Sequence, residues 1–286
     1  QDTLQRRSTG WQRGTTMSKT LYLECYSGIS GDMTVAALLD LGADREVLKE
    51  SLKSLPVGGF RTEITRVKKS GLDVCDFSVI LEQDNHDHDM EYLHGSEKSY
   101  TGHYEHSHEV NHEHHHGHTH SHEHPHEHRG MKEITEIIQK SEMTARAKKM
   151  AMRVFDILAQ AESKAHGVPV EEVHFHEVGA VDSIVDIAAI AICMDNLDIS
   201  NVIVPVLYEG TGFIRCQHGQ IPVPVPAVTH IAETHKLKLK ITDIQGELVT
   251  PTGAAIAGCL RTEQELPERY IIEKIGVGAG TKDFKN

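Results

Sequence analysis

The feature that most limits what this chain can fold into is a histidine-rich stretch near its middle. Across residues 86–128, sixteen of 43 residues are histidine, nine are acidic and one is lysine. Such a segment cannot bury enough apolar surface to offset the entropy lost on ordering. We therefore expect a disordered, metal-binding insert over residues 85–130, between an N-terminal α/β unit (residues 17–84) and an α/β core (residues 131–286).

Charge and composition exclude several classes of protein. The formal net charge of −13 over 286 residues disfavours nucleic acid or an anionic membrane as a partner. No run of eighteen apolar residues predicts a transmembrane span. The five cysteines are scattered without a CxxC pair, which is typical of a reducing cytoplasm, so a cytoplasmic location is expected. Residues 1–16 have no apolar stretch like that of a secretory signal and are expected to be an upstream or artificial extension.

Hydrophobic periodicity predicts an α+β (mixed α/β) fold. Residues 20–83 indicate a β-α-α-β-β unit: a strand over residues 20–28, helices over 32–42 and 43–55, and two strands that turn at Ser70 and Gly71. Beyond the insert, a helical hairpin plus a mixed sheet is expected. A long amphipathic helix ends at Gly167, and an almost wholly apolar, buried helix runs over residues 181–197.

The remaining elements are predicted from short motifs. Strands are expected in "VIVPVLYEG", "GFIRCQHG" and "KLKLKITDI", and "RYIIEKIGVGAG" predicts a last strand that runs into a glycine turn. "PVPAVTHIAET" predicts a short helix. In "VTPTGAAIAGCL", Thr250 is the expected helix cap and Pro251 the first helical residue.

The densest part of the insert has the chemistry of a metal reservoir, because imidazole is the commonest ligand for late first-row metals such as nickel, zinc, copper and cobalt. The metal-binding residues predicted there are His112, His114, His115, His116, His118, His120, His122, His124, His126 and His128. Glu, Gly, Thr, Ser and Pro separate them, so no fixed geometry is specified. A transfer site needs ligands on rigid elements, and it is therefore expected in the folded part.

The strongest local cluster is "HFHEVGAVDSIVDI". His174 and His176 point to the same side of an extended segment, and Glu177 follows. Asp182 and Asp186 share one face of an otherwise apolar helix, where two carboxylates repel unless a cation or several donors lie between them. The cluster predicts a mixed nitrogen and oxygen metal site. The alternative is that Asp182 caps the helix, Asp186 pairs with a lysine or arginine, and the histidines lie in the core.

Two glycine turns are candidate anion sites. "SGISGDM" places Ser27, Gly28, Ser30, Gly31 and Asp32 between a strand and a helix, where backbone amides can cradle a phosphate and Asp32 can hold a divalent cation. "TPTGAA" offers Thr250, Thr252 and Gly253 at a helix start. Ordinary helix capping explains either turn as well. His218 lies at a predicted hairpin tip, and "GVGAG" is too short and too common to indicate a nucleotide.

Taken together, these motifs resemble one protein family. "SGISGDM", "HFHEVGAVDSIVDI", "HGQIPVPVPAVTHI", "ELVTPTGAAI" and "GVGAGTKDF" occur in the order and near the spacing of the LarC family of nickel insertion proteins, over residues 20–284. The resemblance implies insertion of Ni(II) into pyridinium-3,5-bisthiocarboxylic acid mononucleotide by a CTP-dependent nickel chelatase of the lyase class. Mn(II) or Mg(II) is the implied cofactor. The product is the nickel-pincer cofactor of lactate racemase and related enzymes.

The resemblance also assigns roles within the chain. His174, His176, Glu177, Asp182 and Asp186 are the implied transfer site, and His174 and His176 are implied nickel ligands. The implied cofactor-binding residues are Ser27, Gly28, Ser30, Gly31, Asp32, His218, Thr250, Thr252 and Gly253.

The implied partners are the racemase that receives the cofactor and a nucleotide-binding C-terminal domain. Family members continue into that domain, and this chain is expected to lack it. A homo-oligomer is also expected. Two other functions stay open: a passive nickel-storage metallochaperone, and a zinc-dependent hydrolase that uses the His-x-His-Glu cluster.

Overall fold

The computed structural model of the protein describes residues 19–82, 129–173, 175, 180–216 and 219–282. Its helices are α1 (Gly31–Leu41), α2 (Arg45–Lys53), α4 (Met131–Lys140), α5 (Ala145–His166), α6 (Val181–Asn196), α7 (Pro226–His235) and α8 (Pro251–Leu260), with a 3-10 helix η1 at Val170–Glu172. Its strands are β1 (Lys19–Tyr22), β2 (Phe60–Lys69), β3 (Leu72–Leu81), β4 (Ile199–Ile203), β5 (Leu207–Thr211), β6 (Phe213–Cys216), β7 (Gly219–Pro222) and β8 (Leu239–Gln245). The predicted α+β class is confirmed.

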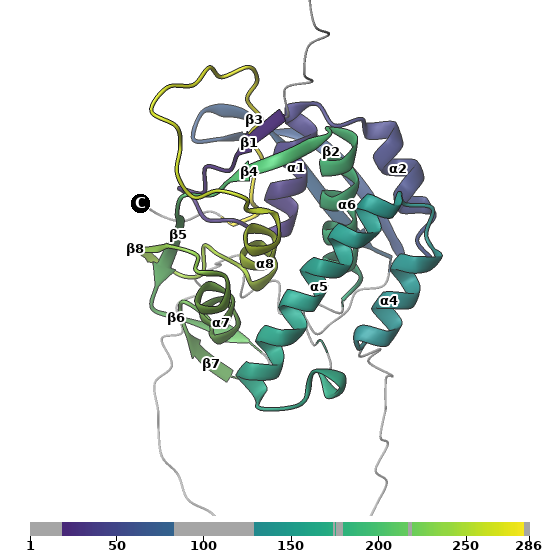
Figure 1. Cartoon of the computed structure of the whole chain (residues 1–286), viewed down its shortest axis with the longest axis vertical. Coiled ribbons are helices and arrows are strands. Elements are labelled where there is room, and N and C mark those ends of the chain that lie inside the picture. The colour runs from purple at the N-terminus through teal and green to yellow at the C-terminus, as the bar shows by residue number, and fades with distance from the viewer. Residues whose placement is uncertain (1–18, 83–128, 174, 176–179, 217–218, 283–286) are drawn as a thin grey trace, which may run out of the picture.

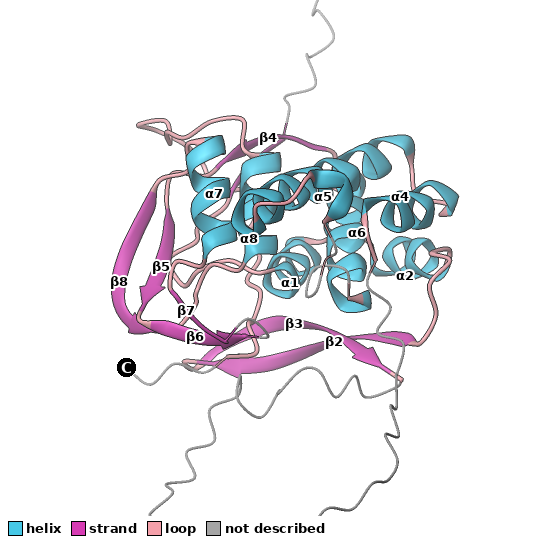
Figure 2. Ribbon diagram, turned by 90° about the horizontal axis from the view of Figure 1, so that it is seen from below, coloured by secondary structure: helices cyan, strands magenta, loops and turns pink. Residues whose placement is uncertain are grey.

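Helix α6 lies at the centre of the molecule. It packs against α1, α2, α5 and β3 (Figure 1), and all of residues 187–194 are buried, as its apolar sequence predicts. The helices gather in one layer, with β2 and β3 along one side and β5 and β8 along another (Figure 2). One hydrophobic core therefore joins elements from both sides of residues 83–128, which lie outside the described residues.

The N-terminal elements follow the predicted β-α-α-β-β order. The side chain of Asp44 accepts hydrogen bonds from the backbone of Glu46 and Val47 and so caps α2. Ser70 and Gly71 both have positive φ angles, 48° and 82°, as a two-residue hairpin turn requires, and β2 and β3 pair along their full length. The first strand is shorter than predicted, because regular pairing with β4 stops at Tyr22.

The helices after residue 129 begin and end at the expected residues. Helix α5 packs against both α4 and α6. Thr144 caps α5, which ends at Gly167 with a φ of 68°, and Thr250 caps α8 with Pro251 as its first residue. None of the described helices is long and apolar enough to cross a membrane.

The described strands form four two-stranded pairs. β1–β4 and β5–β8 are parallel, and β2–β3 and β6–β7 are antiparallel. "VIVPVLYEG", predicted as one strand, is divided between β4 and β5, which pair with different partners. Pro205 lies in the break and has no N–H to donate to a ladder.

The prediction of a last strand over residues 269–280 is wrong. In this range the structure has one isolated bridge, between Cys75 and Gly278, and no strand. Gly276, Gly278 and Gly280 instead lie against α1, where a methyl group on Gly278 would sit 2.0 Å from the Met33 carbonyl oxygen. The glycines of "GVGAG" thus allow close approach of this segment to a helix.

Candidate functional site

The N-terminus of α1 lies against the first turns of α6, and this contact brings the two predicted acidic motifs together. Gly31 is the first residue of α1, and a methyl group there would lie 2.6 Å from Asp186 Oδ2 and 2.9 Å from Asp186 Cβ. Only glycine leaves room for the carboxylate. Asp32 and Asp182 both repel Asp186 electrostatically, so three carboxylates share this region.

Asp186 has a strongly perturbed pKa. Burial raises its pKa well above the usual 3.8, and the charges of Asp32 and Asp182 raise it further. A hydrogen bond from the backbone of Asp32 opposes these effects only in part. The folded protein therefore favours the neutral acid at this position unless a cation is present.

Asp32 shares the same environment. Burial is the largest cause of its raised pKa, while hydrogen bonds from the Ser30 hydroxyl and from the backbone of Met33 lower it. Asp76 of β3 adds a further repulsion. Ser30 stands at the N-cap position of α1, but its side chain makes no capping bond and bonds to Asp32 instead. The capping alternative for this serine is therefore not found.

Two oxygens of the cluster have no partner. Asp182 Oδ1 and Asp186 Oδ1 are buried and accept no hydrogen bond from any described residue. Ala180, not Asp182, is the N-cap of α6, and Asp186 makes no ion pair with a lysine or arginine in the described part of the chain. The capping and ion-pair alternative thus fails for both. Buried acceptors without donors are what a cation would satisfy.

The described side chains do not complete a metal site by themselves. Among residues 19–82, 129–173, 175, 180–216 and 219–282, no group of three or more His, Cys, Asp or Glu is arranged to hold an ion. The predicted ligands His174, His176 and Glu177 lie outside the described residues, as do His218 and the ten tract histidines. Their part in the site stays a prediction.

The residues next to these histidines are placed clearly. Val173 and Phe175 are buried, with 3% and 2% of their surface exposed. The Phe175 N–H donates to the Arg129 carbonyl at 3.3 Å, forming an isolated antiparallel bridge. Arg129 directly follows His128, the last residue of the tract. Arg129, the residue directly after the tract in the sequence, is therefore hydrogen-bonded to the residue between His174 and His176.

The glycine turn before α1 has a structural role. The Ile29 N–H donates to the Leu248 carbonyl at 3.0 Å. Gly28 has a φ of 86°, and a methyl group on it would lie 2.0 Å from the same carbonyl oxygen. Ser27 is exposed beside it. Close packing accounts for Gly28, so the predicted phosphate cradle is not needed to explain it.

The start of α8 is explained by capping. The Thr250 hydroxyl accepts from the Gly253 N–H at 3.0 Å, and Thr252 is buried. A methyl group on Gly253 would lie 2.1 Å from the Ile29 carbonyl oxygen. These contacts give Thr250 and Gly253 structural roles, and anion binding by this turn stays a prediction.

Sequence reasoning missed Glu209, which is fully buried at 0% exposure. Its Oε1 accepts from the backbone N–H groups of Gly210, Leu248 and Val249 at 2.7, 2.8 and 3.1 Å, and Oε2 has no described partner. Burial raises the pKa of Glu209, whereas these hydrogen bonds and the charge of Lys282 lower it. The only signal was an acid beside a glycine in a strand. Glu209 fixes the segment against which the Gly28 turn packs.

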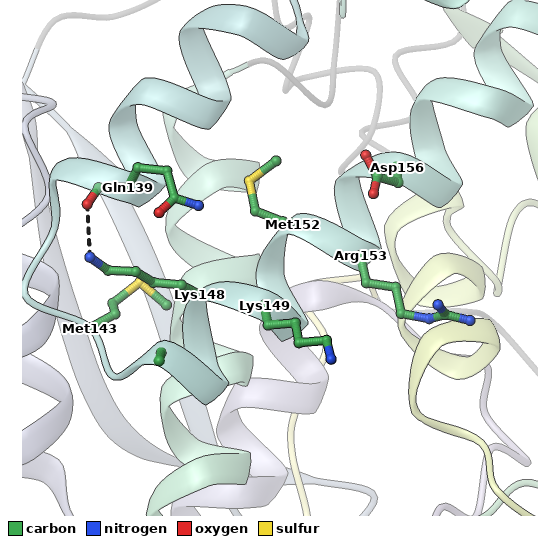
Figure 3. A pocket seen from close by; sticks show the side chains of 8 residues that line it. Gln139, Met143, Lys148, Lys149, Met152, Arg153 and Asp156 are labelled. Atoms are coloured by element: carbon green, nitrogen blue, oxygen red, sulfur yellow. Dashed lines mark hydrogen bonds between the residues drawn. The ribbon is translucent and has the colours of Figure 1, made fainter.

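A separate hollow of about 670 Å³ lies beside α4 and α5 and contains none of the predicted site residues (Figure 3). Its lining includes Lys148, Lys149 and Arg153, and Lys148 donates to the Gln139 carbonyl at 2.8 Å. It has the opposite charge to the acidic cluster. The carboxylates of α1 and α6 are therefore the better candidate for a cation site.

Asp186→Asn is expected to stabilise the metal-free protein at alkaline pH. Since the pKa of Asp186 is raised on folding, its contribution to stability is complete below the unfolded pKa, near 4, and is lost as pH rises through the folded pKa. Asparagine does not ionise, so the variant should be about 1–3 kcal/mol more stable at pH 8 and equal to the wild type near pH 4. Urea unfolding in EDTA at several pH values measures this.

Asp243→Asn, at an exposed position of β8, is the matched control and should change stability little at any pH. A variant at Asp186 that is less stable than the wild type at pH 8 in EDTA would contradict the argument, because the carboxylate would then have a stabilising partner.

Comparisons with known proteins identify the family of the chain. The chain matches the profile of a family described as "Nickel insertion protein" over residues 21–286. The pyridinium-3,5-bisthiocarboxylic acid mononucleotide nickel insertion protein of Alkaliphilus metalliredigens (strain QYMF) is 53% identical over 269 residues, or 94% of this chain and 58% of that protein. Proteins with the same name from Clostridium acetobutylicum and Acetivibrio thermocellus are 43% and 36% identical, over 93% and 92% of this chain and 61% and 57% of their own lengths. No solved structure matches the chain.

Proposed function

The chain belongs to the nickel insertion protein family, and we propose that it binds Ni(II) and inserts it into pyridinium-3,5-bisthiocarboxylic acid mononucleotide to form the nickel-pincer cofactor. The names of its relatives support this substrate. Because the chain spans less than two thirds of their length, we propose further that turnover uses CTP, Mn(II) or Mg(II), and a nucleotide-binding domain supplied separately. A lactate racemase-type enzyme would receive the product.

One observation carries the proposal: the bond between Phe175 and Arg129. It ties Arg129, which follows the histidine-rich tract in the sequence, to Phe175, the residue directly between His174 and His176. Four residues, 176–179, then connect Phe175 to Ala180, the N-cap of α6, the helix that holds Asp182 and Asp186. We infer that nickel collected on the tract passes to the folded site across this bridge, and not along the 46 positions that separate His128 from His174 in the sequence.

The two ligand types of the site suit two different metals. Imidazole nitrogens suit nickel, whereas carboxylate oxygens suit Mn(II) and Mg(II). The unpartnered oxygens of Asp182 and Asp186 fit a hard cation, and Asp32 adds a third carboxylate. Such a cation would neutralise charge on the nucleotide phosphates. The chain's own carboxylates would hold it beside the N-terminus of α1, where backbone N–H groups also favour an anion.

Two buried cysteines, Cys25 and Cys193, are poor candidates for nickel ligands. None of the five cysteines is paired, which agrees with the proposed reducing cytoplasm. Burial raises the pKa of the Cys25 and Cys193 thiols to about 12, so both stay protonated at neutral pH. A thiol binds metal well only as the thiolate. Imidazoles and carboxylates are therefore the proposed nickel ligands.

Reconstitution tests the function directly. Incubating the chain with Ni(II), CTP, Mn(II), the thiocarboxylated mononucleotide and the remaining part of a full-length relative should yield the nickel-containing nucleotide by mass spectrometry. Omitting CTP or this chain should abolish the product. Retention of nickel without product under all conditions would favour a passive store, which the abundance of tract histidines also supports. Sustained zinc-dependent hydrolysis of esters or amides would favour the zinc-dependent hydrolase.

A further inference from the structure

Residues 267–275, called the strap here, form the most exposed apolar segment of the described chain. All nine residues are exposed. Ile271 has 89% of its surface in water, Ile275 67%, Ile272 63% and Tyr270 56%. Figure 1 shows this part of the chain as a yellow loop that arches away from the body. Isolated exposed apolar residues are common, but a run of this kind marks an interaction surface.

The strap also has the composition of a strand, but its backbone has no partner in the described chain. Its flanks are paired: the Glu263 N–H donates to the Val202 carbonyl at 3.1 Å, and the Ala279 N–H donates to the Cys75 carbonyl at 2.7 Å. Between them, the backbone of residues 266–276 makes no hydrogen bond with any described residue. A β-branched segment with free N–H and C=O groups is a template for strand addition.

The sequence of the strap is complementary to itself. An interface between identical copies related by a twofold axis requires that if residue i faces residue j, then j faces i. In the run "ERYIIEK", residues 268–274, placing Ile271 on the axis sets Arg269 opposite Glu273 and Glu268 opposite Lys274. Each acid then faces a base, and the apolar residues meet in the centre.

Neighbouring registers lack this match. An axis between Ile271 and Ile272 sets Arg269 against Lys274, and one between Tyr270 and Ile271 sets Glu268 against Glu273. Both place like charges opposite each other, which destabilises a strand pair. An axis on Ile272 or Tyr270 forms no ion pair. Charge therefore selects one register.

We propose that the strap pairs with the strap of a second copy of this chain, in an antiparallel ladder with Ile271 on the twofold axis. In the single chain Lys274 Nζ lies beside Gly42 at the end of α1, 2.3 Å from the position that a methyl group on Gly42 would take. When two straps pair, this ammonium moves away from α1 to meet Glu268 of the second copy. The bend at Glu268 and Arg269 straightens at the same time. The contact is small, so the dimer should be weak, with a dissociation constant on the order of 10 µM.

Charge reversal tests the register. Sedimentation velocity is run over a range of concentrations in EDTA, so that the tract histidines do not join copies through metal. The wild type should dimerise, and Arg269→Glu or Glu273→Arg should weaken dimerisation by at least about tenfold, because each like-charge pair occurs twice. The double variant should recover the wild-type affinity. Lys132→Glu, an equal change of charge at an exposed position of α4, should have no effect.

Crosslinking tests the axis. Under oxidation, Ile271→Cys should form a disulfide with itself, because its two copies face each other. Ile275→Cys should not, since its copies would lie about eight residues, or roughly 26 Å, apart. The oxidised wild type controls for Cys216 and Cys259, which are half-buried free thiols.

Several results would overturn the proposal. These are a chain that stays monomeric up to about 200 µM (twenty times the expected dissociation constant), dimers unaffected by the strap variants, a double variant that stays as weak as the single ones, or equal crosslinking at positions 271 and 275. Protection of the strap amides from hydrogen exchange only when the remaining part of a relative is added would assign the strap to that partner instead. None of these depends on nickel transfer, so failure here leaves the proposed function untouched.

Discussion

Replacing residues 86–128 by a short Gly-Ser linker is expected to remove about three quarters of the bound nickel and to leave the fold intact. Sixteen of the 22 histidines of the chain lie in this segment, so the imidazoles available for nickel fall in that proportion. The fold should survive because the composition of the segment predicts no contribution to a core. The hydrophobic core of the described elements is built from residues that precede the insert and residues that follow it, and α6 is part of that core.

Metal analysis after dialysis against Ni(II) and far-UV circular dichroism measure the two halves of this result. A variant with all sixteen histidines changed to glutamine is the matched control, because it keeps the length and the acidic residues. It should lose nickel to the same extent. A collapsed far-UV spectrum in the deletion alone would mean that the segment supports the fold. Nickel retained by the glutamine variant would assign binding to the nine acids.

The sequence predicted those elements whose signals are local. The turn at Ser70 and Gly71, the cap at Thr144 and the end of α5 at Gly167 each depend on a few neighbouring residues, and all three are confirmed. The burial of α6 follows from a composition that is apolar on every face. Periodicity and capping chemistry are enough for such features.

Long-range pairing was the part that sequence could not predict. β1 pairs with β4, about 180 positions further along the chain, and no feature of either sequence identifies the other as its partner. Residues 269–275 have the composition of a strand, but their backbone is left without a partner in the described chain, so the predicted strand is absent. Strand propensity indicates that a segment can pair in a β-ladder, but it does not indicate whether a partner strand is available.

The same limit applies to the candidate site. The sequence placed Asp32 in a phosphate-binding turn and Asp186 in a metal cluster, as two separate motifs. Packing of α1 on α6 at Gly31 unites them, and no spacing rule connects positions 32 and 186. Glu209 was missed for a related reason: its three donors come from Gly210 and from residues nearly forty positions away.

His176→Ala is expected to separate storage of nickel from its delivery. Total bound nickel should stay nearly unchanged, because the sixteen histidines of residues 86–128 remain. Delivery into the cofactor should fall by at least about tenfold to a hundredfold, since a lost ligand on the folded part is not replaced from the tract. Asp182→Asn should have the same effect if that carboxylate holds a cation. It should not act through helix capping, because Ala180 is the cap of α6.

The assay is activation of lactate racemase in a lysate that supplies the thiocarboxylated mononucleotide and the part of the family protein beyond this chain. His230→Ala, which removes a half-buried histidine of α7 that contacts Glu233 at 3.9 Å, is the matched control and should activate normally. Loss of delivery in His176→Ala and Asp182→Asn with unchanged nickel content and unchanged urea unfolding would locate transfer beside α6. Full activation by both variants would remove this cluster from the transfer step, because a site that delivers nickel cannot lose an imidazole and a carboxylate ligand without slowing.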